Sequence, residues 1–98
     1  MAYIAVLELR LDPDRLDEGR VAVADLVATT RDSPGNIAVD VVPAENDPAR
    51  LVVVESWASA EADHAYRAFR AQETGPRALA GFLTAAPSLV KGAVDAAI

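Results

Sequence analysis

The sequence predicts an α+β domain in which two helices cover one face of a four-stranded antiparallel sheet. Apolar and polar residues alternate strongly in the segment 2–11, as in a half-buried strand, and the apolar segments 36–42, 50–57 and 88–96 are predicted to be the other three strands. Apolar residues recur at helical spacing in the segments 12–32 and 60–73. In chain order these elements follow the pattern β-α-β-β-α-β, which is the ferredoxin-like arrangement. We expect residues 1–98 to form this single domain.

The first helix opens with strong start signals. Asp12 is the predicted N-cap, Pro13 takes the first helical position, and acidic residues fill the first turn. The face expected to be buried carries Leu16, Val23, Leu26, Val27 and Thr30. Gly19 lies on the same face. Because a glycine inside a helix costs about 1 kcal/mol relative to alanine, Gly19 indicates close packing or space left for a ligand.

The second and third strands are predicted to form a hairpin, because only the polar turn 43–49 separates them. One side of the second strand carries Ile37, Val39 and Val41. Ser59 is the predicted cap of the second helix, which ends before "TGP". Residues 76–83 predict a short extra helix ahead of the last strand.

The composition argues against several classes of function. A net charge of −6, with 15 acidic and 9 scattered basic residues, disfavours binding to nucleic acid and to anionic membranes. No apolar stretch is long enough to cross a bilayer. The chain does not open with a basic region followed by an apolar one, so we expect no secretory signal. The absence of cysteine excludes disulfides, zinc–cysteine sites and thiol catalysis. It is compatible with a cytoplasmic location, which we expect.

The sheet is predicted to be apolar on both faces. The third strand contains "LVVV", and the first strand begins "AYIAV", so apolar residues point to both sides. Two helices protect only one face. The other face needs a cover, and a second copy of the chain packed sheet to sheet would supply it. We therefore expect a homodimer that forms an α+β barrel.

Two motifs resemble those of the antibiotic biosynthesis monooxygenase family, a group of small dimeric α+β barrel proteins. The family commonly shows P-G-C-[LI]-x-Y at its second strand and E-x-W-x-[DS]-x-x-A-[LFM]-x-x-H from its third strand into its second helix. The matching residues here are Pro34, Gly35, Ile37, Glu55, Trp57, Ser59, Glu61 and Ala62. The resemblance covers nearly the whole chain.

The chain departs from the family pattern at four positions. Asn36 stands where the family often has cysteine, and Val39 where it often has tyrosine. Asp63 replaces an apolar residue, and Tyr66 occupies the position of the helix histidine. The resemblance implies a homodimer and, in some members, cofactor-independent oxygenation of quinol or polyketide-like aromatic compounds. Other members degrade haem or isomerise small molecules.

Trp57 and Tyr66 are the predicted catalytic residues. A helical wheel places Ala62, Ala65, Tyr66, Phe69 and Glu73 on the face against the sheet. Trp57 ends the third strand beside this helix. A buried indole N–H or phenol O–H needs a partner, which here is either a ligand in a pocket beneath the helix or a backbone carbonyl in a filled core.

The predicted wall of that pocket consists of Glu55, Phe69, Leu79 and Phe82. Glu55 shares a strand face with Trp57, so it is either a general base in the pocket or an ion-pair partner of Arg10 or Arg50. His64, with Arg67 beside it, falls opposite the buried face and is a weak candidate that we expect to face solvent. No second histidine or cysteine exists to complete a metal site, so no metal is expected.

The sequence therefore supports a small monooxygenase that needs no cofactor and acts on an apolar aromatic quinol or polyketide-like substrate. In this hypothesis the substrate supplies the electrons, Trp57 orients it and Tyr66 donates or relays a proton. The alternative is a non-catalytic module that binds a small ligand or regulates, since one fold hosts many functions. An enclosed cavity touching Trp57 and Tyr66 would favour the enzyme, and a filled core there would favour the module.

Overall fold

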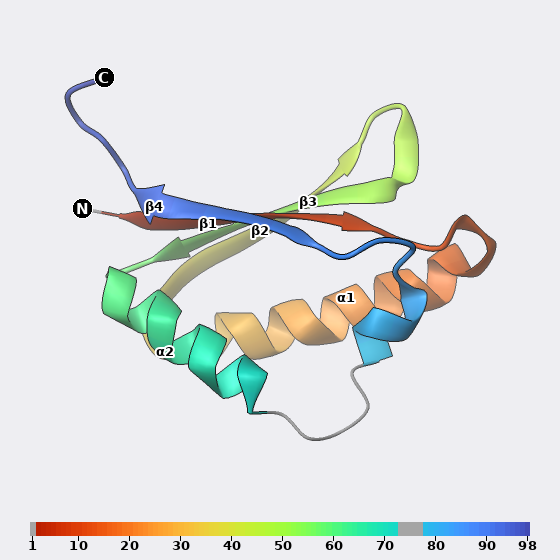
Figure 1. Cartoon of the computed structure of the whole chain (residues 1–98), viewed down its shortest axis with the longest axis horizontal. Helices are drawn as coiled ribbons and strands as arrows, with labels where there is room; N and C mark the ends of the chain where they lie inside the picture. Colours follow the sequence, from red (N-terminus) through yellow and green to blue (C-terminus); the bar gives the residue numbers. More distant parts are fainter. Residues whose placement is uncertain (1, 73–77) are drawn as a thin grey trace.

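The computed structural model describes residues 2–72 and 78–98, with residue 78 described by its backbone only. The elements in chain order are β1 (Tyr3–Arg10), a 3-10 turn η1 (Pro13–Arg15), α1 (Leu16–Arg31), β2 (Asn36–Ala44), β3 (Asp47–Trp57), α2 (Ala60–Ala71), a 3-10 turn η2 (Ala78–Phe82) and β4 (Ser88–Ala93). This is the predicted β-α-β-β-α-β order. Figure 1 shows both helices below the sheet.

The strands form one antiparallel sheet with the order β2-β3-β1-β4. The predicted hairpin of β2 and β3 is confirmed. The central strand β1 pairs along its length with β3 and β4, so that Ala5 stands between Glu55 and Lys91 in the register. These three side chains lie on the helix-covered face, in a row across the sheet. The fold is thus the predicted α+β, ferredoxin-like sheet.

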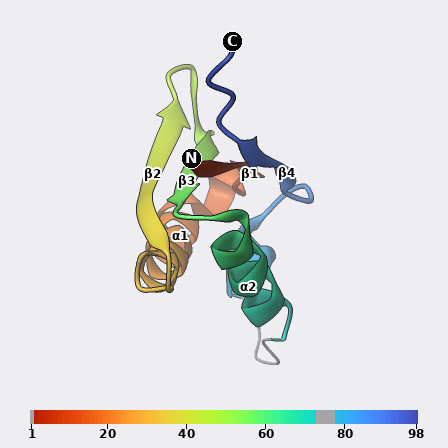
Figure 2. The same cartoon turned by 90° about the vertical axis from the view of Figure 1, so that its left-hand side faces the viewer.

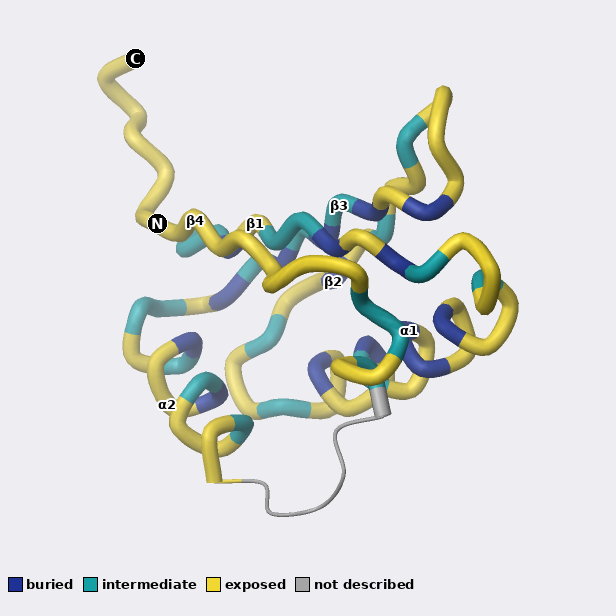
Figure 3. The backbone as a smooth tube through the Cα atoms, turned by 45° about the vertical axis from the view of Figure 1, so that its right-hand side comes forward, coloured by how far each residue is buried: buried dark blue, intermediate teal, exposed yellow. Residues whose placement is uncertain are grey.

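Seen end-on, α1 lies beneath the β2 side of the sheet and α2 beneath the β4 side (Figure 2). The buried core lies between α1 and the sheet, as the dark segments of Figure 3 show. Its members are Leu9, Leu11, Val23, Val27, Val39, Ala49, Leu51 and Val53. The core is therefore concentrated under α1, and α2 covers a different part of the sheet.

The start of α1 differs in detail from the prediction. Asp12 does act as a cap, with its side chain accepting a hydrogen bond from the backbone N–H of Asp14 at 2.9 Å. It caps the 3-10 turn η1, and the α-helix begins at Leu16. The proline therefore starts the turn that leads into α1.

Several predicted boundaries extend too far. Residues 2 and 11 lie outside β1, and residue 11 makes only an isolated bridge to Leu83. The last strand stops at Ala93, and the short extra helix is the 3-10 turn η2. The second helix ends at Ala71, while the predicted end at Glu73 and the predicted start of the extra helix at Pro76 lie outside the described residues.

The second strand contains an irregularity that the alternation pattern does not show. A register shift between Asn36 and Ala38 breaks the two-residue period at Ile37. Val39 is buried and Val41 partly buried, as predicted, whereas Ile37 is 62% exposed. The prediction that Ile37 shares their side is therefore wrong, because the bulge turns it away from the core.

Two glycines permit close contacts that position the helices. Gly35 has a φ of +80°, and a Cβ atom there would lie 2.5 Å from the Cβ of Ala62, at the start of α2. Gly19 is buried, and a Cβ there would lie 3.2 Å from a methyl group of Leu11. The sequence-based expectation of close packing at Gly19 is confirmed.

One face of the sheet carries no helix (Figure 1), and this face is apolar at its centre. Val6 pairs with Val54 on one side and with Val90 on the other, and all three point away from the helices. Val6 is 36% exposed and Val90 is 73% exposed. Val42 and Val52 extend this apolar surface toward the hairpin. We call this surface of Val6, Val42, Val52, Val54 and Val90 the open face.

None of the helices in residues 2–72 and 78–98 is long and apolar enough to span a membrane.

Candidate functional site

Trp57 and Tyr66 meet inside the protein. Their ring centroids are 5.2 Å apart, with the ring planes tilted by 33°. Trp57 is fully buried and Tyr66 is 5% exposed. Trp57 is the last residue of β3, and α2 follows it and places the ring of Tyr66 against the indole. The sequence-based expectation that these two residues come together therefore agrees with the geometry.

Both polar groups of this pair are bonded to other side chains. The indole N–H of Trp57 donates to Oε1 of Glu55 at 3.1 Å. The Tyr66 hydroxyl shares a hydrogen bond with the hydroxyl of Thr30 at 2.6 Å. Burial raises the pKa of Tyr66, and the hydrogen bond with Thr30 offsets part of that rise. Neither residue presents a free donor to an internal cavity in this structure.

A partly buried network of charges lies beside the aromatic pair. Arg67 contacts two carboxylates, Oε1 of Glu55 at 2.5 Å and Oδ1 of Asp63 at 3.2 Å. Lys91 on β4 completes it, with its Nζ 2.7 Å from Oδ2 of Asp63. Asp63 is fully buried. Ala5 lies between Glu55 and Lys91 on the helix-covered face of the sheet. Its small side chain leaves space on that face for the two longer side chains.

The network is balanced in charge, since two carboxylates face two cations. A buried charge is tolerated only when it is paired and hydrogen-bonded. Oδ1 of Asp63 and Nε of Arg67 face each other but make no hydrogen bond with any described group. The network therefore fastens α2 to β3 and β4 mainly through ion pairs, in contrast to the apolar packing of α1.

The prediction for the partner of Glu55 is wrong. Arg10 and Arg50 point to the open-face side, where both pair with Glu8 at 3.2 and 3.0 Å. The bidentate contact with Arg50 holds the pKa of Glu8 below its usual value. Glu55 lies on the opposite face of the sheet and binds Arg67 instead.

The predicted inward face of α2 is rotated from the real one. Asp63 and Tyr66 are buried, and Arg67 is half-buried, whereas Ala65 and Phe69 are exposed. The predicted pocket role of Phe69 conflicts with its exposure of 50%. Glu73, also expected on the inward face, lies outside the described residues.

The other predicted pocket residues are dispersed. Leu79 packs on the core cluster, and the Cβ of Phe82 lies 3.4 Å from where a Cβ of Gly19 would stand. Arg15 lies over the Phe82 ring at 4.3 Å. His64 is exposed, as predicted, and makes an edge contact with Tyr3 at 6.0 Å between ring centroids. The predicted wall therefore does not gather around Trp57 and Tyr66.

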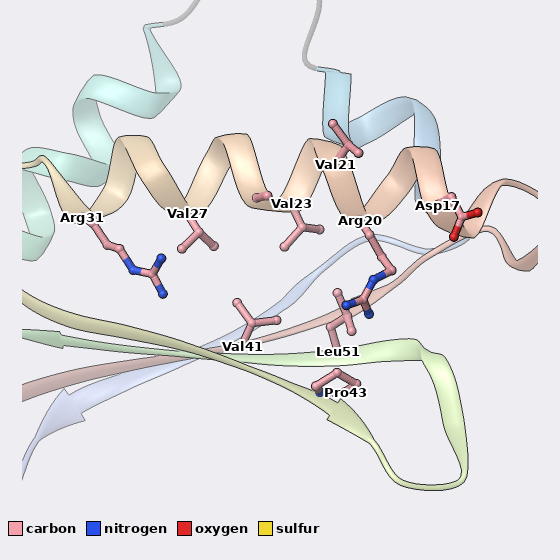
Figure 4. A pocket seen from close by; sticks show the side chains of 10 residues that line it. Asp17, Arg20, Val21, Val23, Val27, Arg31, Val41, Pro43 and Leu51 are labelled. Atoms are coloured by element: carbon pink, nitrogen blue, oxygen red, sulfur yellow. The ribbon is translucent and has the colours of Figure 1, made fainter.

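A groove of about 600 Å³ lies between α1 and the strands β2 and β3 (Figure 4). Its volume falls within the range of small-molecule sites. The residues that line it are Asp17, Arg20, Val21, Val23, Ala24, Val27, Arg31, Val41, Pro43 and Leu51. The prediction of a pocket beneath the second helix missed this groove, which belongs to the first helix.

The groove combines an apolar middle with charged ends. Val27 and Val41 face each other across it, and Arg20 and Arg31 reach from α1 toward the strands on either side of them (Figure 4). Asp17 lies one turn before Arg20 at the same end of the groove. Such a site suits a flat apolar molecule that carries polar groups at its ends.

The sequence contained partial signals for these features. Lys91 shares a strand face with Leu89 and Ala93, so the period of β4 places a charge toward the helices. An inward lysine needs an inward carboxylate, and Asp63 with Arg67 at the i,i+4 spacing was available. No local sequence pattern predicts the groove, because its existence depends on the distance between α1 and the edge strand β2.

Among residues 2–72 and 78–98, no group of three or more His, Asp or Glu side chains is arranged to hold a metal ion.

The fold and the groove define a small α+β protein with one helix-covered sheet face and one open face. The sequence model of the antibiotic biosynthesis monooxygenase family matches residues 2–75, and the chain belongs to this family. Membership supports a monooxygenase-like function in general terms. No curated protein matches the chain significantly.

Three solved structures share the fold over almost the entire chain. A crystal structure of an antibiotic biosynthesis monooxygenase aligns at 17% identity and a TM-score of 0.76, covering 97% of this chain and 99% of that one. Rv0793 from Mycobacterium tuberculosis aligns at 20% identity and a TM-score of 0.73, covering 100% of both. A conserved protein from Methanosarcina mazei aligns at 18% identity and a TM-score of 0.71, covering 94% of this chain and 91% of that one. At such low identity these likenesses show the fold alone.

Proposed function

We propose that this protein is a small monooxygenase that oxygenates a phenolic or hydroquinone-type aromatic compound without a cofactor, and that the substrate lies in the groove between α1 and the strands β2 and β3. The observation that carries the proposal is the groove itself, an apolar site lined at one end by a carboxylate and an arginine. Family membership supplies the reaction class.

The substrate provides the electrons in this reaction. A phenol transfers its O–H proton to Asp17, and the resulting phenolate is stabilised by the guanidinium of Arg20. The phenolate passes one electron to O2, and superoxide then combines with the ring radical at a conjugated carbon that carries hydrogen. The proton returns to form a hydroperoxide. Loss of water leaves a quinone carbonyl, so one oxygen atom enters the ring and the other leaves as water.

The apolar walls contribute in two ways. Val27, Val41 and Leu51 exclude water from the ring and from the radical pair. They offer no group that superoxide can oxidise. Desolvation alone would favour the neutral phenol, so the charge of Arg20 is what makes the phenolate accessible.

Neither Trp57 nor Tyr66 lines the groove, so in this proposal they retain their predicted role only if the substrate reaches them and they exchange partners. Trp57 would have to release Glu55 to donate to a substrate, and Tyr66 would have to release Thr30. The double variant Trp57→Phe/Tyr66→Phe separates the possibilities. Full activity in a folded double variant removes both from the mechanism, and loss of activity in a double variant that is fully folded at the assay temperature places them in it.

Oxygen uptake tests the reaction. Wild-type protein is mixed with a panel of phenols, hydroquinones and polycyclic aromatic phenols, and O2 consumption is followed together with quinone formation. Ala24→Trp, which fills the groove from an exposed lining position, should abolish uptake. Ala28→Trp is the matched control, because Ala28 is exposed on the same helix and does not line the groove.

A second pair of variants tests the base. Asp17→Asn should lower the rate by about 10²-fold, a typical contribution of a general base. Glu18→Gln removes a neighbouring acid from the same first turn of α1 and should leave the rate unchanged. Equal rates in Asp17→Asn and wild type would overturn the assignment of the base.

A non-catalytic module that binds a small ligand is the second candidate. The filled core at Trp57 and Tyr66 favours it, because the two aromatic residues that could act on a substrate are bonded to the protein. A protein that binds aromatic phenols in the groove, consumes no O2 with any of them and releases them unchanged would identify this module.

The assembly and location belong to the same proposal. We propose that residues 1–98 act as one domain, that two copies pack through the open face into an α+β barrel, and that the dimer works in the cytoplasm. The unpartnered valines of the open face support the dimer. The absence of cysteine is compatible with a reducing compartment.

A further inference from the structure

The two ends of the groove differ in their balance of charge. At one end Asp17 and Arg20 are both present, so a carboxylate offsets a guanidinium. At the other end Arg31 is the only charged residue among those described that lines the groove. Arg31 makes no ion pair within the described part of the chain. An anion placed at the Arg31 end would therefore meet an uncompensated positive charge.

The guanidinium of Arg31 is also held in place. Its NH2 group donates to the backbone carbonyl of Val39 at 2.8 Å, and Val39 is 3% exposed in the strand β2. The carbonyl is neutral, so it orients the guanidinium without cancelling its charge. A guanidinium has five N–H donors in a planar fork, and this bond uses one of them. The others are available to a planar acidic group.

The helix dipole accounts for part of this arrangement. A cation in the last turn of α1 interacts favourably with the helix C-terminus, and Arg70 in the last turn of α2 is a second instance. The dipole does not require the guanidinium to bridge to β2 or to line a groove. Arg31 does both, and Arg70 does not line the groove.

We propose that Arg31 binds a carboxylate or sulfonate group of an elongated, flat, apolar molecule that lies along the groove with its hydroxylated ring between Asp17 and Arg20. Arg20 and Arg31 are three helical turns apart, about 16 Å along α1. The valines between them provide an apolar surface on which fused aromatic rings can pack. The identification of this molecule as the substrate rests on the proposed function, but its binding does not.

A pair of fluorescent probes tests the inference directly. 1-Anilinonaphthalene-8-sulfonate carries an acidic group on a flat apolar body, and N-phenyl-1-naphthylamine has the same body without the acid. Wild-type protein should bind the sulfonate about tenfold more tightly, the equivalent of about 1.4 kcal/mol. Arg31→Gln should remove this preference and leave the affinity for the neutral amine unchanged. Arg31→Lys should retain part of the preference.

Two further variants locate the effect. Ala24→Trp should weaken both probes, since it fills the groove. Arg70→Gln removes a positive charge from the last turn of the other helix and should change neither affinity. Equal affinities for both probes in wild type would overturn the inference, as would unchanged sulfonate binding in Arg31→Gln or in Ala24→Trp.

The test of anion binding at Arg31 is independent of the test of the proposed reaction, because binding of the probes needs no oxygen. A groove that prefers the sulfonate in a protein without oxygen uptake would leave Arg31 as an anion site in a binding module. Oxygen uptake that shows no preference for acidic over neutral phenols would retain the monooxygenase and reject the acidic molecule as its substrate, while anion binding at Arg31 is decided by the two probes.

Discussion

Arg67 of α2 and Glu55 of β3 form a buried ion pair, with 2.5 Å between the guanidinium nitrogen and Oε1. The same carboxylate oxygen accepts the indole N–H of Trp57. Glu55, a residue of the family motif on β3, therefore contacts both the aromatic pair and the helix α2. The position of α2 depends on these polar contacts, since its buried residues are Asp63 and Tyr66 rather than aliphatic side chains.

Removing Arg67 should destabilise the protein strongly. Arg67→Leu leaves the carboxylate of Glu55 buried without its cation, and breaking one side of such a pair costs about 3 kcal/mol or more. Urea unfolding measures the loss. Glu18→Gln, which breaks the exposed pair with Arg15, should cost less than about 1 kcal/mol. The double variant Glu55→Gln/Arg67→Leu should recover much of the loss. A double variant no more stable than Arg67→Leu would contradict this account of the pair.

Much of the fold follows from local chemistry. Asp12 and Pro13 mark the entry to the first helix, and the turn 43–49 predicts the hairpin of β2 and β3. Both features involve residues close in sequence, whose conformations depend mainly on their own side chains. The bulge at Ile37 escaped prediction because a strand with apolar residues on both faces has no alternation to reveal it.

The candidate site was less accessible to sequence reasoning. A helical wheel directs apolar residues inward, so it placed Phe69 against the sheet and Arg67 in solvent. The face of α2 that is really buried is turned by about 80° from the predicted one, on a wheel of 100° per residue. The cause is two ion pairs with the sheet, Arg67 with Glu55 and Asp63 with Lys91. Such a choice depends on partners far apart in the chain, which periodicity within one helix cannot show.

Gly35→Ala should destabilise the protein by about 2 kcal/mol. The backbone at Gly35 has a positive φ, which alone costs an L-residue about 1–2 kcal/mol, and the new methyl group would lie 2.5 Å from the Cβ of Ala62. Thermal unfolding measures the effect. Gly81→Ala is the control, because nothing lies within 4 Å of its Cβ position. Gly35→Ala/Ala62→Gly should relieve the contact but not the backbone strain, and so recover stability only in part.

Tyr66 should make folding sensitive to alkaline pH. Burial raises its pKa in the folded state, with the Thr30 hydrogen bond opposing part of the rise. A raised folded pKa means that the contribution to stability is complete below about pH 10, the unfolded value, and is lost as pH rises through the folded pKa. Within that window each pH unit costs about 1.4 kcal/mol.

The measurement compares unfolding free energies of wild type and Tyr66→Phe from pH 8 to the alkaline limit of about pH 12. The variant should be less stable by a constant of about 1 kcal/mol at neutral pH, the value of a lost hydrogen bond. The difference should shrink above about pH 10. Tyr3→Phe is the control at a partly exposed tyrosine. Parallel curves for wild type and Tyr66→Phe would show that Tyr66 ionises as it does in the unfolded chain.

Val54→Asp should prevent dimerisation. Val54 lies at the centre of the open face, opposite Val6 in the register, where a carboxylate would be buried without a cation in a sheet-to-sheet dimer. Sedimentation analysis should show wild type as a dimer and the variant as a monomer. Val21→Asp is the control, since Val21 is a valine 63% exposed on α1, away from the open face.

Salt concentration gives a second test of the same interface. The ion-paired side chains of Glu8, Arg10 and Arg50 border the open face. If the valines supply most of the free energy of dimerisation, raising the salt concentration should weaken the dimer only slightly. A wild-type chain that sediments as a monomer at every salt concentration would leave the open face exposed and remove the barrel from the proposal.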